Sequence, residues 1–350
     1  MIVKKSSLIK NFLLLFLVII GLYYAKIFLM PFSIGGVLAS LFLPLCKRME
    51  KMKVPKGIAV LLCIIILLVT LGGIFTLLGL HFSALITDFS EVKQKSIEIL
   101  ARIQEYIFNN LGVSAEKLSQ IFNDEQPSFA KIVQVMAGSL VYIITNFILI
   151  LVYFFCLLFY RGHIKNFILK LTAPSERNEM EQVIYSAAQV SQQYLVGLAK
   201  MIVCLWIMYG IGFSLIGVKN PLFFAVLCGL LEIVPFIGNL TGTLLTIVVA
   251  AVQGASFTML GLIIITYGLV QFIQGWVLEP LLVGHQVKIN PFITIIALVI
   301  GELIWGISGI FLAIPLTAMF KIVSDHIELL KPYGFLIGEI ETKKKEPIIA

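Results

Sequence analysis

Three acidic side chains stand in the long apolar stretches of the C-terminal half, namely Glu232, Glu279 and Glu302. A charged residue at the centre of a membrane-spanning helix costs about 2.5–3.5 kcal/mol on insertion scales, so we treat each as a functional candidate. A carboxylate in that setting can bind a cation or exchange a proton. The alternative is structural, with a protonated glutamate bonded to a neighbouring helix or an acid at the headgroup interface.

Backbone breaks lie close to these acids. Glu232 precedes Pro235 by three residues; the proline frees a backbone carbonyl, and Gly238 lets the chain turn. Paired interruptions of apolar segments are the best sequence indication of a transport site, because a broken helix exposes backbone groups that only protein or a water-filled cavity can receive. The second interrupted segment carries Gly306, Gly309 and Pro315.

Uncharged polar residues flank the same breaks. Gln271 and Gln274 precede Glu279 on earlier helical turns, and with Pro280 they predict a polar stripe facing a pathway. A second group is able to hydrogen-bond a small polar ligand, although hydrogen bonding between helices explains such residues equally well. That group comprises Asn239, Thr241, Thr243 and Asn290.

The composition indicates what must position these residues. Of the 350 residues, 59% are hydrophobic and 13% are charged, and the mean hydropathy is +1.02. Soluble proteins carry about 25% charged residues, so the chain lacks the charge to cover a soluble surface. It is predicted to be an all-α, polytopic integral membrane protein with about eight transmembrane helices and two broken or re-entrant segments in its C-terminal half. This excludes a cytosolic enzyme and a secreted disulfide scaffold.

Lysine and arginine near the ends of the apolar runs predict the orientation. The net charge is +7, and clusters of basic residues mark cytoplasmic loops. We therefore expect both termini to be cytoplasmic in a bacterial inner membrane. The predicted segments are three transmembrane helices (1–82), an extracytoplasmic amphipathic helical insert (83–135), a fourth transmembrane helix (136–160), a cytoplasmic amphipathic helix (161–200), a transmembrane transport core (201–330) and a cytoplasmic tail (331–350).

Two topologies fit the long apolar runs 221–252 and 289–323. A bilayer is crossed by about 20 apolar residues, so each run is too long for one straight helix. In the first topology, which we prefer, both runs cross as tilted or kinked spans and the chain has eight spans. In the second, both are re-entrant hairpins and six spans remain. An impermeant thiol reagent applied to intact cells distinguishes the two topologies. It labels Lys288→Cys in the first topology, where loop 280–290 is outside, and not in the second, where this loop is inside.

Enzyme and metal chemistry find little support in the chain. Gly306-Ile-Ser308-Gly309 resembles the nucleophile string of an intramembrane protease, but such a serine needs an activating histidine. All four histidines sit at span ends or in loops. The five cysteines form no C-x-x-C pair and are interpreted as small apolar residues. We predict no catalytic residues, no metal, no cofactor and no nucleic-acid partner.

The order and spacing of several short motifs resemble the autoinducer-2 exporter family of bacterial membrane permeases. The resemblance spans the whole chain, although Asn239 and Glu302 stand where many members have proline and a small residue. The motifs are Tyr194-Leu-Val-Gly197, Pro235-Phe-Ile-Gly238, Glu279-Pro280 with Gly284, Asn290-Pro291, Gly306 with Gly309, and Ala313-Ile-Pro315-Leu316.

The resemblance implies an eight-span permease that exports the furanone signal autoinducer-2, while other members are associated with sodium or lithium/proton antiport. It also implies a homo-oligomer, with a pentamer as one expected assembly. From residues and resemblance together we expect an exporter of a small polar solute, coupled to H⁺ or Na⁺. The alternatives are a cation/proton antiporter that uses the same acids and a channel or non-transporting membrane scaffold.

Overall fold

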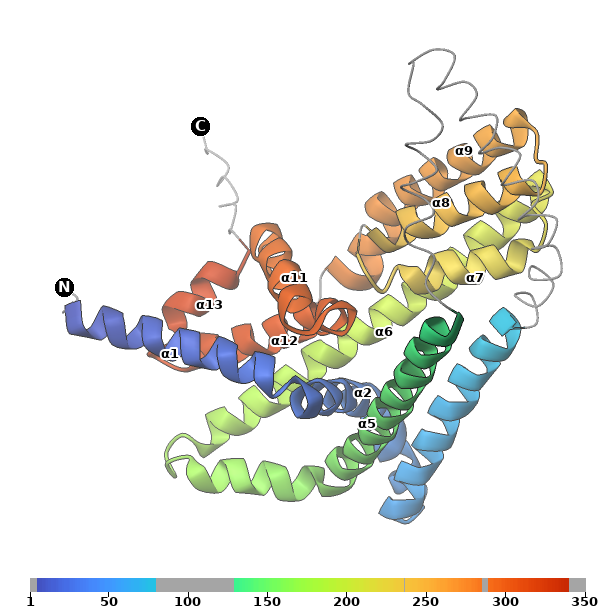
Figure 1. Ribbon diagram of the computed structural model, residues 1–350. Coiled ribbons are helices and arrows are strands. Elements are labelled where there is room, and N and C mark those ends of the chain that lie inside the picture. Colours follow the sequence, from blue (N-terminus) through green and yellow to red (C-terminus); the bar gives the residue numbers. More distant parts are fainter. Residues whose placement is uncertain (1–4, 80–128, 236, 285–288, 340–350) are drawn as a thin grey trace, which may run out of the picture. The chain divides into compact units, whose positions relative to one another are not determined.

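A computed structural model describes residues 5–79, 129–235, 237–284 and 289–339, and within these ranges the chain is helical and forms no β-strand (Figure 1). Most of the predicted insert 83–135, Lys288 and residues 340–350 of the predicted tail lie outside the described residues. The helices are α1 (Lys5–Tyr24), α2 (Lys26–Lys51), an unlabelled helix over Lys56–Gly79, α5 (Phe129–Leu171), α6 (Arg177–Ile216), α7 (Pro221–Leu231), α8 (Ile237–Val252), α9 (Phe257–Ile273), α11 (Pro291–Trp305), α12 (Ile307–His326) and α13 (Lys331–Ile337).

Six of the described helices are long and apolar enough to cross a membrane. In lipid only a helix can satisfy all its own backbone hydrogen bonds, which explains why these apolar stretches are helical throughout. The membrane-length segments are Lys26–Lys51, Lys56–Gly79, Val141–Leu171, Arg177–Ile216, Phe257–Leu282 and Ile307–His326. The predicted all-α, polytopic class is confirmed.

The helices α5 and α6 are longer than a single span. The 43 residues of α5 are about twice the number that crosses a bilayer once. The predicted segment boundary at 160–161 falls inside α5, and the one at 200–201 falls inside α6. Both predicted boundaries therefore fall within continuous helices and do not separate elements of the structure.

The described chain divides into two compact units. The first comprises residues 1–67, 147–201 and 274–350. Its larger core joins α2, the start of helix Lys56–Gly79 and α5 through side chains that include Cys46, Val60, Cys63 and Phe154, all fully buried. A smaller core joins Ala318 of α12 to Ile337 of α13.

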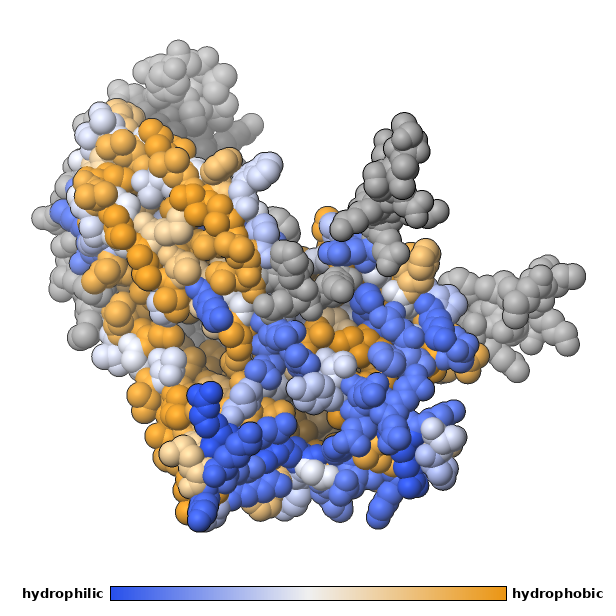
Figure 2. Space-filling model, turned by 180° about the vertical axis from the view of Figure 1, so that it is seen from behind, coloured by the Kyte–Doolittle hydropathy of each residue, from blue (hydrophilic) through white to orange (hydrophobic). Residues whose placement is uncertain are grey.

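The second unit comprises residues 68–146 and 202–273 and contains α7, α8 and α9. Leu205 and Phe213 of α6, Phe224 of α7 and Ile263 of α9 are completely buried within it. Many of the outer side chains of this unit are exposed and hydrophobic, and orange surface dominates over these helices in Figure 2. Lipid is the solvent that such a surface suits.

Both long apolar runs fold back on themselves as helical hairpins. Helices α7 and α8 pack against each other across the break after Leu231, and α11 and α12 pack across Gly306. Neither run is the single tilted or kinked helix of the topology we preferred. In this respect the structure agrees with the second topology, because each run turns where its glycine and proline residues interrupt the helix.

Candidate functional site

The first helix break positions the acid Glu232 at the tip of the α7–α8 hairpin. Helix α7 ends at Leu231, a turn covers Glu232–Pro235, and α8 begins at Ile237. The turn is tight, because a Cβ atom on Gly238 would lie 1.6 Å from the carbonyl oxygen of Leu231. Only glycine permits so close an approach, which is the role the sequence predicts for Gly238 beside Pro235.

A buried polar cluster lies at this turn. Glu232 is 5% exposed, and Asn239 and Tyr209 are fully buried. The hydroxyl of Tyr209, on α6, donates a 2.6 Å hydrogen bond to Oδ1 of Asn239, on α8. The turn that carries Glu232 leads directly into the first turn of α8, where Asn239 lies. Three elements of the second unit thus bring polar groups together in an interior that is otherwise apolar.

The cluster continues along α8 toward α7. Asn239, Thr243 and Thr246 are spaced at helical intervals, so they share one face of α8, and all three are buried. The Sγ atom of Cys228, on α7, lies 4.0 Å from Oγ1 of Thr246, which donates a 2.8 Å hydrogen bond to the carbonyl of Gly242. We call the set Tyr209, Cys228, Glu232, Asn239, Thr243 and Thr246 the Glu232 cluster.

Thr241, which the sequence groups with Asn239 and Thr243 as a residue able to bind a polar ligand, lies on another side of α8. It is exposed at the surface of α8, whereas Asn239 and Thr243 are buried. An offset of two residues rotates a side chain to the far side of a helix, so Thr241 faces away from Asn239 and Thr243.

The other two glutamates belong to the first unit, while Glu232 belongs to the second. Both Glu279 and Glu302 are exposed side chains in the described chain, Glu302 on α11 and Glu279 beside Pro280. Of the three acids, all of which lie among the described residues, only Glu232 lies in a buried polar cluster.

The predicted polar stripe before Glu279 follows a helix that changes its winding. Gln271 donates a 3.2 Å hydrogen bond to the hydroxyl of Tyr267 on α9, and Gln274 is buried in the first unit. From Gln274 the chain winds as two short π-helical segments, Gln274–Leu278 and Pro280–Gly284. A π-helix advances more residues per turn than an α-helix, so it shifts the stripe out of its α-helical register.

The second hairpin is built by a cap and a close glycine contact. Oδ1 of Asn290 accepts a 2.9 Å hydrogen bond from the backbone N–H of Phe292 and thereby caps α11. Gly306 adopts a positive φ of 63° at the turn, and a Cβ atom on Gly309 would lie 1.8 Å from the carbonyl oxygen of Gly301. Gly309 and Pro315 are both buried within α12.

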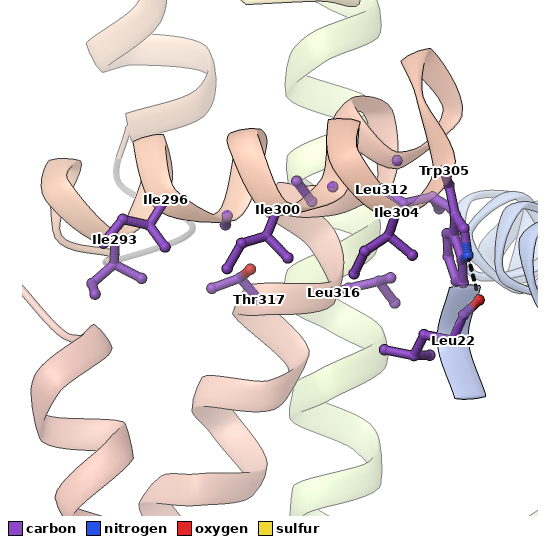
Figure 3. A pocket seen from close by; sticks show the side chains of 13 residues that line it. Leu22, Ile293, Ile296, Ile300, Ile304, Trp305, Leu312, Leu316 and Thr317 are labelled. Carbon is purple, nitrogen blue, oxygen red and sulfur yellow. Dashed lines mark hydrogen bonds between the residues drawn. The ribbon is translucent and has the colours of Figure 1, made fainter. Parts of the chain in front are cut away.

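A cavity of about 330 Å³ lies along this hairpin and beside α1. The lining residues that Figure 3 labels are aliphatic except for Thr317 and Trp305. Nε1 of Trp305 donates a 3.0 Å hydrogen bond to the carbonyl of Leu22. None of the three glutamates lines this cavity. Its chemistry suits an apolar group and does not suit a hydroxylated solute.

Sequence reasoning missed Tyr209, Cys228 and Thr246 in the Glu232 cluster. Each stands in an apolar run where a tyrosine, cysteine or threonine is an ordinary core residue, so its type carries no signal. A weak signal exists for Thr246, because it continues the helical spacing of Asn239 and Thr243.

Comparison with known proteins identifies the family of the chain. Residues 12–329 match the sequence profile of a family described as AI-2E family transporter. The chain belongs to the AI-2E transporter family. The match runs from within α1 to beyond the end of α12 and so includes residues of both units. The resemblance deduced from the short motifs is confirmed.

Several curated relatives of this AI-2E protein are named for transport. "Putative transport protein YueF" of Bacillus subtilis is 24% identical over 307 residues, covering 83% of this chain and 82% of the relative. "Putative transport protein YhhT" of Escherichia coli is 21% identical over 337 residues, covering 95% of this chain and 94% of the relative. The match to "Putative transport protein YrrI" of Bacillus subtilis, 29% identical over 133 residues, covers 38% of this chain and 37% of the relative.

Proposed function

We propose that this AI-2E family protein is an inner-membrane permease that exports a small polar solute, and that the Glu232 cluster binds the solute or its coupling ion. The observation that carries this proposal is the burial of a carboxyl group at a helix break, beside Tyr209 and Asn239. By resemblance to the family, the solute is autoinducer-2 or a similar hydroxylated furanone.

Membrane energetics support a functional reason for the cluster. Burying polar side chains in the apolar interior of a bundle costs free energy unless they are paired. An all-apolar hairpin would avoid that cost. A transporter retains such groups because its cargo supplies hydrogen-bonding partners or charge at membrane depth.

The chemistry of the cluster also suits coupling to H⁺ or Na⁺. Glu232 can accept a proton. Hard cations prefer oxygen ligands, and the cluster offers the carboxylate of Glu232, the amide oxygen of Asn239 and the hydroxyl oxygen of Thr243. Backbone carbonyls freed at the turn before Pro235 are further ligands of the kind found in broken transporter helices. The same groups would serve a sodium or lithium/proton antiporter, which is the alternative function.

The membrane setting forms part of the proposal. The basic residues flanking the early spans favour an orientation with both termini in the cytoplasm. We further propose, by resemblance to the family, that the working form is a homo-oligomer, with a pentamer as the first assembly to test. In the channel or scaffold alternative, the same fold would sit in the membrane without coupled flux.

Flux measurements on reconstituted protein test the proposal. Proteoliposomes are given imposed proton or sodium gradients, and the movement of the autoinducer-2 furanone and of protons is recorded for the parent and for Glu232→Gln. We expect Glu232→Gln to lose gradient-driven flux. Glu328→Gln is the matched control, since Glu328 pairs with Lys331 in an exposed position.

The possible outcomes separate the alternatives. Furanone flux that depends on the gradient and on Glu232 supports the exporter. Proton flux driven by sodium or lithium without furanone movement supports the antiporter. Equal flux in the parent and Glu232→Gln removes the Glu232 cluster from the mechanism, and no flux of either kind above empty vesicles supports the scaffold.

A further inference from the structure

The largest basic cavity of the first unit among those described lies where α2, α5 and α6 meet, and its volume is about 730 Å³. Lys47 of α2 and Arg161 and Lys165 of α5 line it, with Glu181 of α6 as its acidic residue. Hydrophilic surface is gathered toward the lower part of the face in Figure 2, which includes the polar portions of these helices. The residues of this cavity take no part in the transport proposal.

The three bases differ in how firmly they are held. The guanidinium of Arg161 pairs with Glu50, lies 3.5 Å from Sγ of Cys46 and donates to the carbonyl of Leu158 at 3.2 Å. Its side chain is 24% exposed. Arg161 is therefore a structural tie between α2 and α5, and its charge is already matched by a carboxylate.

Lys165 and Lys47 are more available to a ligand. Lys165 pairs with Glu181 at 2.5 Å, but the two side chains are 40% and 52% exposed. An ion pair this accessible to water is weak, so a stronger anion can displace Glu181. Lys47 is exposed and makes no ion pair among the described residues.

The rest of the cavity is apolar or interfacial. Leu43 precedes Lys47 by one turn of α2, and Tyr185 of α6 stands at the rim with 63% of its surface exposed. Tyrosine is enriched where a membrane protein passes from lipid to headgroups. Basic groups beside an aliphatic wall, at the ends of membrane-length helices, match a molecule that joins an anionic head to an apolar tail.

We propose that this cavity binds the phosphate group of an anionic phospholipid, with Lys47 and Lys165 as its ligands and the aliphatic wall against the start of the acyl chains. Further bases follow Lys47 in the chain and add to the local positive charge. They are Arg48, Lys51, Lys53 and Lys56.

Native mass spectrometry of the full-length protein in detergent tests the proposal. Binding of phosphatidylglycerol is compared with that of phosphatidylcholine carrying the same acyl chains. We expect the parent to prefer phosphatidylglycerol, and Lys47→Gln to weaken phosphatidylglycerol binding about fivefold. Glu181→Gln should strengthen it, because the variant frees Lys165 and removes a negative charge. Lys170→Gln, an exposed lysine of α5 outside the cavity, controls for net charge.

Three outcomes would overturn the assignment. One is equal binding of the two lipids by the parent protein. Another is equal weakening by Lys47→Gln and Lys170→Gln, which would indicate a general effect of charge. The third is complete displacement of phosphatidylglycerol by an equal concentration of inorganic phosphate, which would identify a site for a free anion.

Discussion

The hydroxyl of Tyr209 donates a 2.6 Å hydrogen bond to Oδ1 of Asn239, and both side chains are completely buried. The bond joins the C-terminal part of α6 to the first turn of α8. It therefore holds the break of the α7–α8 hairpin, and with it Glu232, against a long helix of the same unit.

Tyr209→Phe removes this donor and leaves the Asn239 oxygen buried without it. We expect a loss of about 0.5–1.5 kcal/mol in the free energy of unfolding, because the variant loses one buried intramolecular hydrogen bond. Unfolding in mixed micelles measures the change, with Tyr333→Phe, at an exposed tyrosine of α13, as the control. Identical unfolding curves for the two variants would show that the bond contributes nothing.

Gly238→Ala tests the tightness of the hairpin turn. The new Cβ would meet the carbonyl oxygen of Leu231 at 1.6 Å, so backbone must move. We expect destabilisation of at least about 3 kcal/mol, at the upper end of the range for overpacked sites. Gly261→Ala is the matched control, because its Cβ would have no neighbour within 4 Å and alanine favours a helix. Similar melting of both variants would contradict the close contact.

The pair of Glu50 and Arg161 is expected to stabilise the first unit. Each side chain is about one quarter exposed, and Arg161 also contacts Cys46. Glu50→Gln, Arg161→Gln and the double variant form a double-mutant cycle, for which we expect a coupling energy of about 1–2 kcal/mol. A coupling near zero would place the pair with ordinary surface ion pairs.

Trp305→Phe is expected to loosen α1. The indole N–H of Trp305 donates to the carbonyl of Leu22, which lies in the last turn of α1 (Figure 3). Phenylalanine keeps the ring but loses the donor, at a cost of about 1 kcal/mol. Hydrogen exchange of the last turns of α1 should accelerate about fivefold, while exchange in α8 is unchanged. Equal exchange in the parent and the variant would argue against this attachment.

Much of the architecture follows from local chemistry that a sequence displays. Pro235 with Gly238, and Gly306 with Gly309, mark the places where the long runs turn, because proline ends a helix and glycine allows close approach. The choice between a kinked span and a hairpin did not follow. It depends on whether the two halves of a run pack on each other, and uniformly apolar helices show no periodicity that reveals a packing face.

The amino-acid sequence by itself determined that this is an all-α membrane protein of the AI-2E family and that Glu232 stands at a helix break. Those properties depend on composition, on order along the chain and on the conformational limits of single residues. Only the tertiary structure decided that Tyr209 bonds to Asn239, that Cys228 lies beside Thr246, and that Arg161 pairs with Glu50. Such partners lie far apart in the chain, and they meet because buried polar groups must find each other once the helices fold back.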